Sequence, residues 1–211
     1  MRTIGMILGA VAVVAWAQNL PTAQQVMQRL AQKANTTRSY AYQWEFQERD
    51  EKTGKLGDKQ VYKLEFLKPH YRKMTIIQRD LFSNGAVLIY NPDEDSKVNA
   101  RRGIIRRSYE KNDPEIARFF ETDLDHIVKD LQRLFRGAQA EPVKSTTVNG
   151  RNGWQVVFRP RGDAIQRVVL VVDAQDSMPL RIEYHDAKGL RSVRAFTEYS
   201  FPNLKPDDFK F

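Results

Sequence analysis

The feature that most constrains the fold is an alternation of apolar and polar residues with a period of two. In one run every second residue is aromatic: Tyr40, Tyr42, Trp44 and Phe46. Residues 60–67 repeat this pattern with Tyr62, Leu64 and Phe66. Successive side chains of a β-strand point to opposite faces of a sheet, so each run predicts a strand with one apolar face.

Shorter segments with the same signature follow along most of the chain. They predict strands over residues 72–78, 86–90, 97–101, 143–148, 154–159, 167–172, 180–184 and 192–199. Turns rich in Gly, Asn and Asp lie between them, including one over 149–153, and such short turns join antiparallel neighbours. A sheet of about ten strands must curl. We therefore expect an α+β fold that is mainly β: a strongly curved antiparallel sheet, or unclosed half-barrel, with two helices packed on its concave face.

Two segments have the 3.6-residue period of amphipathic helices instead. In residues 21–36 one face is apolar: Val26, Met27, Leu30, Ala31 and Ala34. Residues 114–137 carry a longer apolar stripe: Ile116, Phe119, Phe120, Leu124, Ile127, Leu131, Leu134 and Phe135. Asp113 and Pro114 suit the start of this second helix, while Thr122 leaves open a break within it. A face this apolar has to be buried against something.

Residues 1–17 have the features of an export signal. One arginine precedes an apolar run over residues 4–14, which is shorter than the roughly 20 residues that a membrane-spanning helix needs. Ala15 and Ala17 form the small-x-small motif of a signal peptidase site. We expect cleavage after Ala17 and an exported, soluble, single-domain mature chain of residues 18–211. The alternative is an uncleaved amphiphilic anchor.

Composition removes several classes of protein. The 211 residues include 34 Lys and Arg against 26 Asp and Glu, a formal net charge of +8, and no cysteine. Without cysteine there is no disulfide framework, cysteine zinc site, iron–sulfur site or catalytic thiol. Neither a Gly-x-Ser-x-Gly nor a His-Glu-x-x-His motif is present, so we expect no enzyme and no cofactor. Nucleic acid is a poor partner for an exported chain despite the positive charge.

The carboxyl-terminal third carries a run of motifs. Residues 179–189 read Pro-Leu-Arg-Ile-Glu-Tyr-His-Asp-Ala-Lys-Gly, and Phe196 stands in the next expected strand. Asn203 and Leu204 follow, and then residues 208–211, Asp-Phe-Lys-Phe. This order resembles the LolA-like outer-membrane lipoprotein carrier proteins, whose sequences have a Pro-rich strand start, an Asp-x-x-Gly hairpin, a Phe strand and a closing Phe-x-Phe.

Two upstream segments extend the resemblance over most of the mature chain. Residues 66–72 contain Phe-Leu-Lys-Pro and then Tyr-Arg, similar to a strand-to-strand turn of that family. Residues 84–92 read Asn-Gly-Ala-Val-Leu-Ile-Tyr-Asn-Pro, similar to its hairpin motif, although Asn84 stands where the carriers usually have Asp. The stretch 91–102, with its basic Arg101 and Arg102, is closer to an uncharacterised branch of the same superfamily than to the carriers themselves.

The resemblance implies a fold, a location and a class of function. Its fold is an unclosed antiparallel barrel with helices packed in its mouth, and its members bind acyl chains or lipoproteins, or sense them. We therefore expect a monomeric periplasmic carrier that takes part in outer-membrane lipoprotein sorting or lipid transport. The alternative is an envelope sensor of the same fold that signals through a protein contact.

Apolar strand and helix positions are the candidate ligand-binding residues. An acyl chain needs apolar walls, and burial stabilises it by about 0.8 kcal/mol per CH₂ group. The candidate residues are Tyr42, Trp44, Phe46, Tyr62, Leu64, Phe66, Leu88, Tyr90, Phe119, Phe120, Phe135, Trp154, Val156 and Phe158. Two interpretations stay open. These side chains line a hollow beneath a helical lid over residues 114–137, or they form an ordinary filled core beneath a fixed helix.

Two polar clusters have alternative interpretations as well. A dense basic patch lies near one expected hairpin: Arg101, Arg102, Arg106 and Arg107. It suits docking onto anionic lipid head groups or an envelope protein, and the alternative is a solvated loop. Asp123, His126 and Asp130 share one side of the second helix, a spacing that a metal could use. We interpret them as the polar edge of an amphipathic helix and expect no metal.

Overall fold

The computed structural model describes residues 20–211, so the expected signal over residues 1–17 lies outside the described residues. The strands are β1 (Ser39–Glu48), β2 (Gln60–Leu67), β3 (Tyr71–Gln78), β4 (Val87–Tyr90), β5 (Val98–Arg102), β6 (Ile105–Tyr109), β7 (Gln139–Ala140), β8 (Lys144–Val148), β9 (Arg151–Arg159), β10 (Arg167–Asp173), β11 (Pro179–Asp186) and β12 (Gly189–Ser200). The α-helices are α1 (Ala23–Thr36), α2 (Ala117–Glu121) and α3 (Leu124–Phe135), and the 3-10 helices are η1 (Pro114–Ile116) and η2 (Pro206–Phe209).

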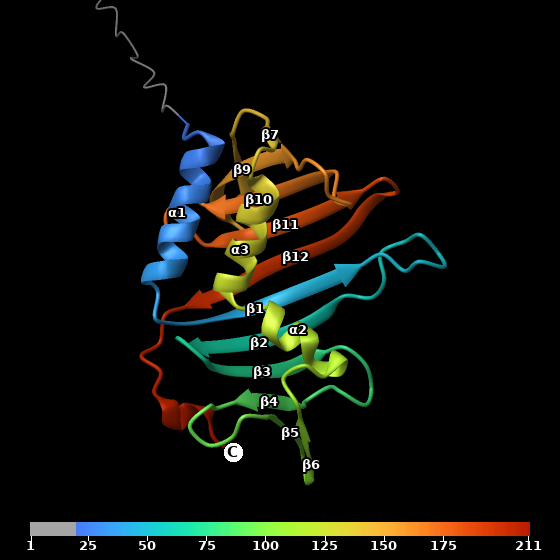
Figure 1. Ribbon diagram of the computed structural model, residues 1–211, viewed down its shortest axis with the longest axis vertical. Coiled ribbons are helices and arrows are strands. Elements are labelled where there is room, and N and C mark those ends of the chain that lie inside the picture. The colour runs from blue at the N-terminus through green and yellow to red at the C-terminus, as the bar shows by residue number, and fades with distance from the viewer. Residues whose placement is uncertain (1–19) are drawn as a thin grey trace, which may run out of the picture.

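All twelve strands form one antiparallel sheet (Figure 1). Its order is β6-β5-β4-β3-β2-β1-β12-β11-β10-β9-β7, and β8 also pairs with β9. The first and last strands are therefore neighbours in the middle, where Trp44 lies opposite Phe196. One half of the sheet consists of β1–β6 and the other half of β7–β12. In the described residues β6 has no further strand on its outer side, so the sheet is open.

The helices form a layer on one face of the sheet (Figure 1). Thr22 begins α1 with a capping box, since its hydroxyl accepts from the Gln25 N–H while the Gln25 side chain accepts from the Thr22 N–H. Helices α1 and α3 pack against each other over the β9–β12 half, whereas α2 lies over β1–β3 (Figure 1). Long helices therefore cover β9–β12, and a short helix covers β1–β3.

The core lies between this layer and the sheet. Aromatic residues from neighbouring strands stand side by side beneath the helices, because β1 and β2 pair Trp44 with Tyr62 and Tyr40 with Phe66. The ring centroids of these two pairs are 5.3 Å and 4.9 Å apart. Val156 and Phe158 of β9 belong to the same continuous cluster. The period-two pattern thus encodes one buried face of the sheet.

The α+β, mainly β fold and the strands expected from the sequence are confirmed, with differences at some ends. Strand β6 was not expected, because four of its five side chains are exposed and it shows no alternation. The two-residue strand β7 was not expected either. The expected turn over 149–153 is shorter, since β9 already begins at Arg151. The strong curvature stays a prediction.

The expectation of two helices is wrong. Residues 114–137 form η1, α2 and α3 rather than one helix, and the break that Thr122 left open falls at Thr122 and Asp123. Asp123 has extended backbone angles and its carboxylate accepts from the His126 N–H at 2.6 Å, so it caps a new helix. Among the helices of residues 20–211, none is both long and apolar enough to cross a membrane.

Candidate functional site

The break between α2 and α3 lies directly over the aromatic stripe of the sheet. Two tyrosines of β1 reach up to it: the Tyr42 hydroxyl donates to the Thr122 carbonyl, and the Tyr40 hydroxyl accepts from the Leu124 N–H at 2.9 Å. Both backbone groups belong to helix ends that lack an intrahelical partner. The sheet therefore holds the helix layer at its break.

Burial keeps these two hydroxyls neutral. The loss of water around Tyr40 and Tyr42 raises the pKa of each phenol well above 10, because a phenolate would be poorly solvated there. The raised pKa of Tyr42 keeps its proton available for the Thr122 carbonyl.

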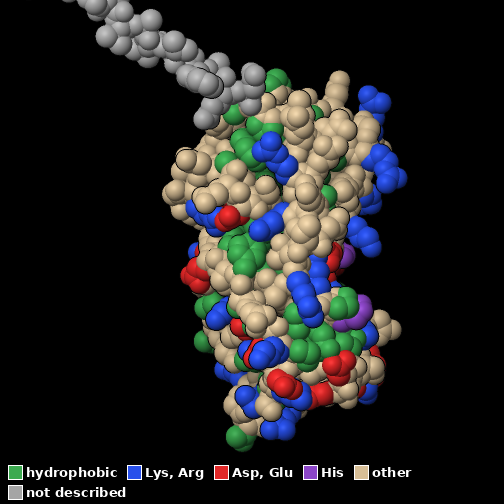
Figure 2. Space-filling view, turned by 90° about the vertical axis from the view of Figure 1, so that its left-hand side faces the viewer, with side chains coloured by type: hydrophobic (Ala, Val, Ile, Leu, Met, Phe, Trp, Pro, Cys, Tyr) green, Lys and Arg blue, Asp and Glu red, His purple; other side chains and the backbone are tan. Residues whose placement is uncertain are grey.

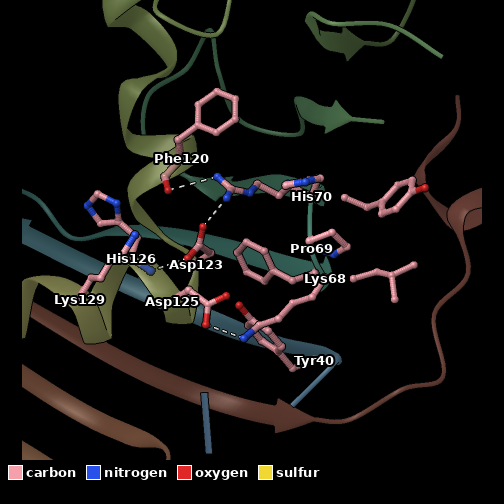
Figure 3. A pocket seen from close by; sticks show the side chains of 13 residues that line it. Tyr40, Lys68, Pro69, His70, Phe120, Asp123, Asp125, His126 and Lys129 are labelled. Carbon is pink, nitrogen blue, oxygen red and sulfur yellow. Dashed lines mark hydrogen bonds and ion pairs between the residues drawn. The ribbon is translucent and has the colours of Figure 1, made fainter. Parts of the chain in front are cut away.

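Arg72 of β3 makes the second attachment of the helix layer. Its guanidinium donates to the Phe120 carbonyl at 3.2 Å and forms an ion pair with the Asp123 carboxylate (Figure 3). It also lies over the Phe120 ring, 5.0 Å from the ring centroid. The Arg72 and Asp123 side chains are only 17% and 11% exposed, so this pair is poorly screened by water. One side chain thus binds the end of α2 and the start of α3.

A polar hollow of about 390 Å³ opens beside this attachment (Figure 3). Lys68 crosses it to pair with Asp125 at 2.5 Å and also donates to the Ala34 carbonyl at the end of α1. Figure 3 shows His126 and Lys129 of α3 on one side and His70 on the other. The hollow has a mixed lining, with apolar Phe66 and Phe120 among these charges.

Two further hollows lie on the other side of α2. One, of about 630 Å³, is bounded by β3–β6 and η1, and the other, of about 320 Å³, extends beneath η1 and α2. Their linings share five residues, so the two hollows adjoin: Ile76, Arg79, Leu88, Glu115 and Ile116. A fourth hollow, of about 740 Å³, lies between α1 and α3.

The surface charge in the half of the molecule away from α1 has no single sign. Figure 2 shows the side of the molecule that carries α1, where acidic and basic side chains are interspersed in the lower half. Several basic groups there are paired, as Lys210 is with Glu94 and Asp207.

The structure places the fourteen candidate residues in two groups. Six line a hollow: Phe66 and Phe120 at the polar one, Tyr62, Leu88 and Phe119 beside α2, and Phe135 between α1 and α3. The other eight lie in the packed core or against it: Tyr42, Trp44, Phe46, Leu64, Tyr90, Trp154, Val156 and Phe158. The first group borders hollows, although Tyr62, Phe66 and Phe119 are themselves buried, and the second group lies away from the hollows described above.

The remaining candidate residues take separate places. Arg101 and Arg102 lie on β5, Arg106 and Arg107 on β6, and Arg101 pairs with Arg106 across the two strands. Asp123 is held by Arg72, while Asp130 of α3 pairs with Arg133 at 2.8 Å. Among residues 20–211 no three His, Asp or Glu side chains come together as a metal would require.

The sequence alone did not identify the residues that hold the helix layer. Tyr40 was seen only as a strand residue and Arg72 only as part of a motif, Tyr-Arg after Phe-Leu-Lys-Pro. The signal for Arg72 was a positive charge on the strand face that also carries the apolar Met74 and Ile76. Its partner Asp123 could not be read from the sequence, because 51 residues separate the two.

Comparison with known proteins finds structural matches. No protein-family model and no curated protein matches the chain. The crystal structure of MucB matches 90% of this chain and 62% of its own, with a TM-score of 0.53 and 13% identity. MucB in complex with MucA from Pseudomonas aeruginosa matches 89% of this chain and 60% of its own, with a TM-score of 0.50 and 14% identity.

Two further matches cover nearly the whole of the other protein. The Mycobacterium tuberculosis lipoprotein LppX matches over 87% of this chain and 99% of its own, with a TM-score of 0.52 and 6% identity. A LolA superfamily protein from Nitrosomonas europaea matches over 91% and 99%, with a TM-score of 0.42 and 10% identity.

At these identities the likeness concerns the fold alone. This chain spans about 62% of the length of MucB. The matches to MucB and LppX extend over almost nine tenths of this chain or more, and they include the sheet and its helix layer. The protein therefore has the LolA-like fold that its sequence motifs predicted.

Proposed function

We propose that the protein is a periplasmic carrier, without enzymatic activity, that holds the acyl chains of a lipid or lipoprotein against its sheet. One observation carries the proposal: the aromatic face of β1–β3 is covered by the three-residue η1 and the five-residue α2, with adjoining hollows beside them. A permanent core can be covered by one continuous helix. A cargo that enters and leaves requires a cover that can move, and short separate helices can do so.

Short helices depend on their packing for stability. Isolated helices below about 12 residues are marginal in water, so η1 and α2 stay folded only through contact with the sheet. Their polar attachments to the sheet are Arg72 to the Phe120 carbonyl, Tyr42 to the Thr122 carbonyl, and Arg118 to Gln60 at 2.9 Å and to Glu48 at 3.4 Å. An acyl chain that replaces α2 on the sheet supplies about 0.8 kcal/mol per buried CH₂ group against these contacts.

The candidate residues then take graded roles. Tyr62, Leu88 and Phe119 contact the first part of the chain, because they already line the hollows beside α2. Trp44 and Phe46 come into contact once α2 moves away. Trp154 lies in the other half, where Arg29 of α1 covers its ring at 4.8 Å, and it meets only a cargo that also displaces α1.

An envelope sensor is the second candidate. MucB, which shares this fold, is known in a complex with MucA. In this alternative the same hollows detect an acyl chain, and a protein contact reports it. Recovery of one specific protein partner by mature chain with no bound lipid would favour the sensor.

Native mass spectrometry of exported residues 18–211, purified without detergent, tests the carrier function. We expect a stoichiometric acyl species, which lipid extraction then identifies. Arg72→Ala removes one attachment of α2 and of α3 and should speed exchange of a fluorescent fatty acid several-fold. The matched control is Arg161→Ala, since Arg161 is exposed in the β9–β10 turn and its side chain makes no hydrogen bond among the described residues.

A clean mass with no uptake of added lipid or lipopeptide would contradict the carrier function. Equal exchange rates for Arg72→Ala and Arg161→Ala, in protein that does bind lipid, would be consistent with the carrier function. They would show that Arg72 does not control the exchange of lipid.

A further inference from the structure

The four most exposed large apolar side chains of residues 20–211 lie on two neighbouring hairpin tips. Leu81 and Phe82, in the β3–β4 loop, are 84% and 85% exposed, and Ile104 and Ile105, at the β5–β6 turn, are 99% and 60% exposed. Strands β4 and β5 pair directly, with Val87 opposite Arg101, so the two tips belong to the same end of the sheet.

Arg102 holds these two tips together. Its guanidinium donates to the carbonyls of Leu81 at 2.9 Å, Phe82 at 2.6 Å and Asn84 at 3.0 Å. One side chain of the β5–β6 hairpin thus satisfies three carbonyls of the β3–β4 loop. The apolar side chains of both tips are thereby held at one end of the sheet, and we name residues 81–82 and 104–105 the double tip. Phe82 and Ile105 also line the hollow of about 630 Å³.

The β3–β4 loop is also ordered from within. The Asp80 carboxylate accepts from the N–H groups of Phe82 at 2.9 Å and Ser83 at 2.8 Å, and from the Ser83 hydroxyl at 2.6 Å. The Asn84 side chain accepts from the Arg79 N–H at 2.7 Å. Polar backbone groups that find partners inside the loop lose little when water is removed around them. The loop can therefore leave water without a large desolvation penalty.

Positive charge lies beside the double tip. Arg101, Arg106 and Arg107 flank the β5–β6 turn. The side chains of Arg106 and Arg107 have no ion-pair partner among the described residues, whereas Arg79, before the β3–β4 loop, pairs with Asp80 at 3.6 Å. Exposed apolar side chains beside these arginines match a surface that is apolar at depth and anionic at its face.

We propose that the double tip docks the protein onto a bilayer that contains anionic lipid. Leu81, Phe82 and Ile104 enter the boundary between head groups and acyl chains, and the arginines bind lipid phosphates. A bilayer is favoured over a protein groove, because the most exposed apolar side chains stand beside arginines, the combination that an anionic lipid surface accommodates. The inference does not depend on any cargo.

Vesicle flotation tests this proposal with the mature chain, residues 18–211. We expect the protein to float with phosphatidylcholine vesicles that contain phosphatidylglycerol, and less with phosphatidylcholine alone. Leu81→Ser with Ile104→Ser should lower the partition coefficient at least about tenfold, because two inserted side chains are lost. The matched control, Leu20→Ser with Leu56→Ser, removes two exposed leucines elsewhere and should change it less than about twofold.

A second variant separates charge from insertion. Arg106→Glu should weaken binding to the anionic vesicles several-fold and leave binding to phosphatidylcholine alone unchanged. Neither Leu81, Ile104 nor Arg106 lines a hollow described above, so all variants should keep wild-type fatty-acid uptake and thermal stability. Failure of the docking proposal is therefore distinguishable from failure of the carrier function.

Three results would overturn the proposal. They are the absence of wild-type flotation with both vesicle types, an equal loss for the Leu81 and Leu20 pairs, and no effect of phosphatidylglycerol. The first of these, together with capture of one envelope protein by the wild type but not by the Leu81 pair, would assign the double tip to a protein partner instead.

Discussion

Strands β9–β12 and strands β3–β6 belong to opposite halves of the sheet. Both sets are antiparallel, but the helices that cover them differ. In β10 every residue from Val168 to Asp173 is buried, and Val168, Leu170 and Val172 belong to the core cluster that includes residues of α1 and α3. In β6 the four residues before Tyr109 are exposed, and η1 and the strands β3–β6 bound a hollow. The comparison teaches that long helices cover an apolar strand face continuously, whereas the short η1 and α2 leave hollows beside buried side chains such as Tyr62 and Ile76.

The largest expected difference between the halves is in the cost of a cavity. Leu170→Ala, on β10, should lower the free energy of unfolding by about 3–5 kcal/mol, because its side chain is completely buried. Leu88→Ala, on β4, should cost about 1 kcal/mol, because Leu88 is half-buried beside a hollow. Urea unfolding measures the free energy of unfolding of both variants. An equal loss in the two would mean that both halves are equally packed.

Alkaline pH probes the exclusion of water from the packed half. Burial raises the pKa of Tyr184, on β11, to about 12 from its ordinary 10.0. Its neutral form is therefore favoured by folding, so the contribution is fully present below pH 10 and is lost as the pH rises towards 12. Tyr184→Phe should remove up to about 3 kcal/mol of that decline. Urea unfolding at several pH values measures this loss. If the free energy of unfolding of the variant fell with pH as steeply as that of the wild type, Tyr184 would be solvated.

Two glycines give a smaller contrast. A Cβ at Gly153 of β9 would lie 2.8 Å from Val171 Cγ1 and 2.9 Å from the Val172 carbonyl oxygen, so Gly153→Ala should cost about 2 kcal/mol through overpacking. Gly103, at the β5–β6 turn, has open space around it but a φ of +58°, and Gly103→Ala should cost about 1 kcal/mol through backbone strain alone. Thermal unfolding ranks the two, and the reverse order would contradict the packing difference.

Much of this architecture follows from local sequence patterns. Strands such as β1 and β2 could be predicted because Tyr42, Trp44 and Tyr62 alternate with polar residues, and α1 because its apolar face repeats at helical spacing. The LolA-like fold followed from motifs whose order along the chain is preserved. Local periodicity carries this information because it records which side of each element is buried.

Other features depend on contacts that no local pattern records. The break in the second helix is fixed by Asp123, whose carboxylate caps α3 and also binds Arg72 from another part of the chain. The exposed tips were missed because Leu81 and Ile104 look like any apolar residue in a short loop until Arg102 joins the loops. The candidate residues were chosen by type, and only the positions of the helices separate Leu88, beside a hollow, from Phe158, in the core.

The central claim is that an acyl chain binds beneath α2 and not in the packed half, and tryptophan quenching tests it most directly. The mature chain has Trp44 on β1, beside Tyr62, and Trp154 on β9, so single-tryptophan variants Trp154→Phe and Trp44→Phe report on one half each. A brominated fatty acid should quench Trp44 fluorescence strongly and saturably and leave Trp154 nearly unchanged, with the unbrominated acid as control. Quenching of Trp154 alone, or of neither residue, would contradict the account.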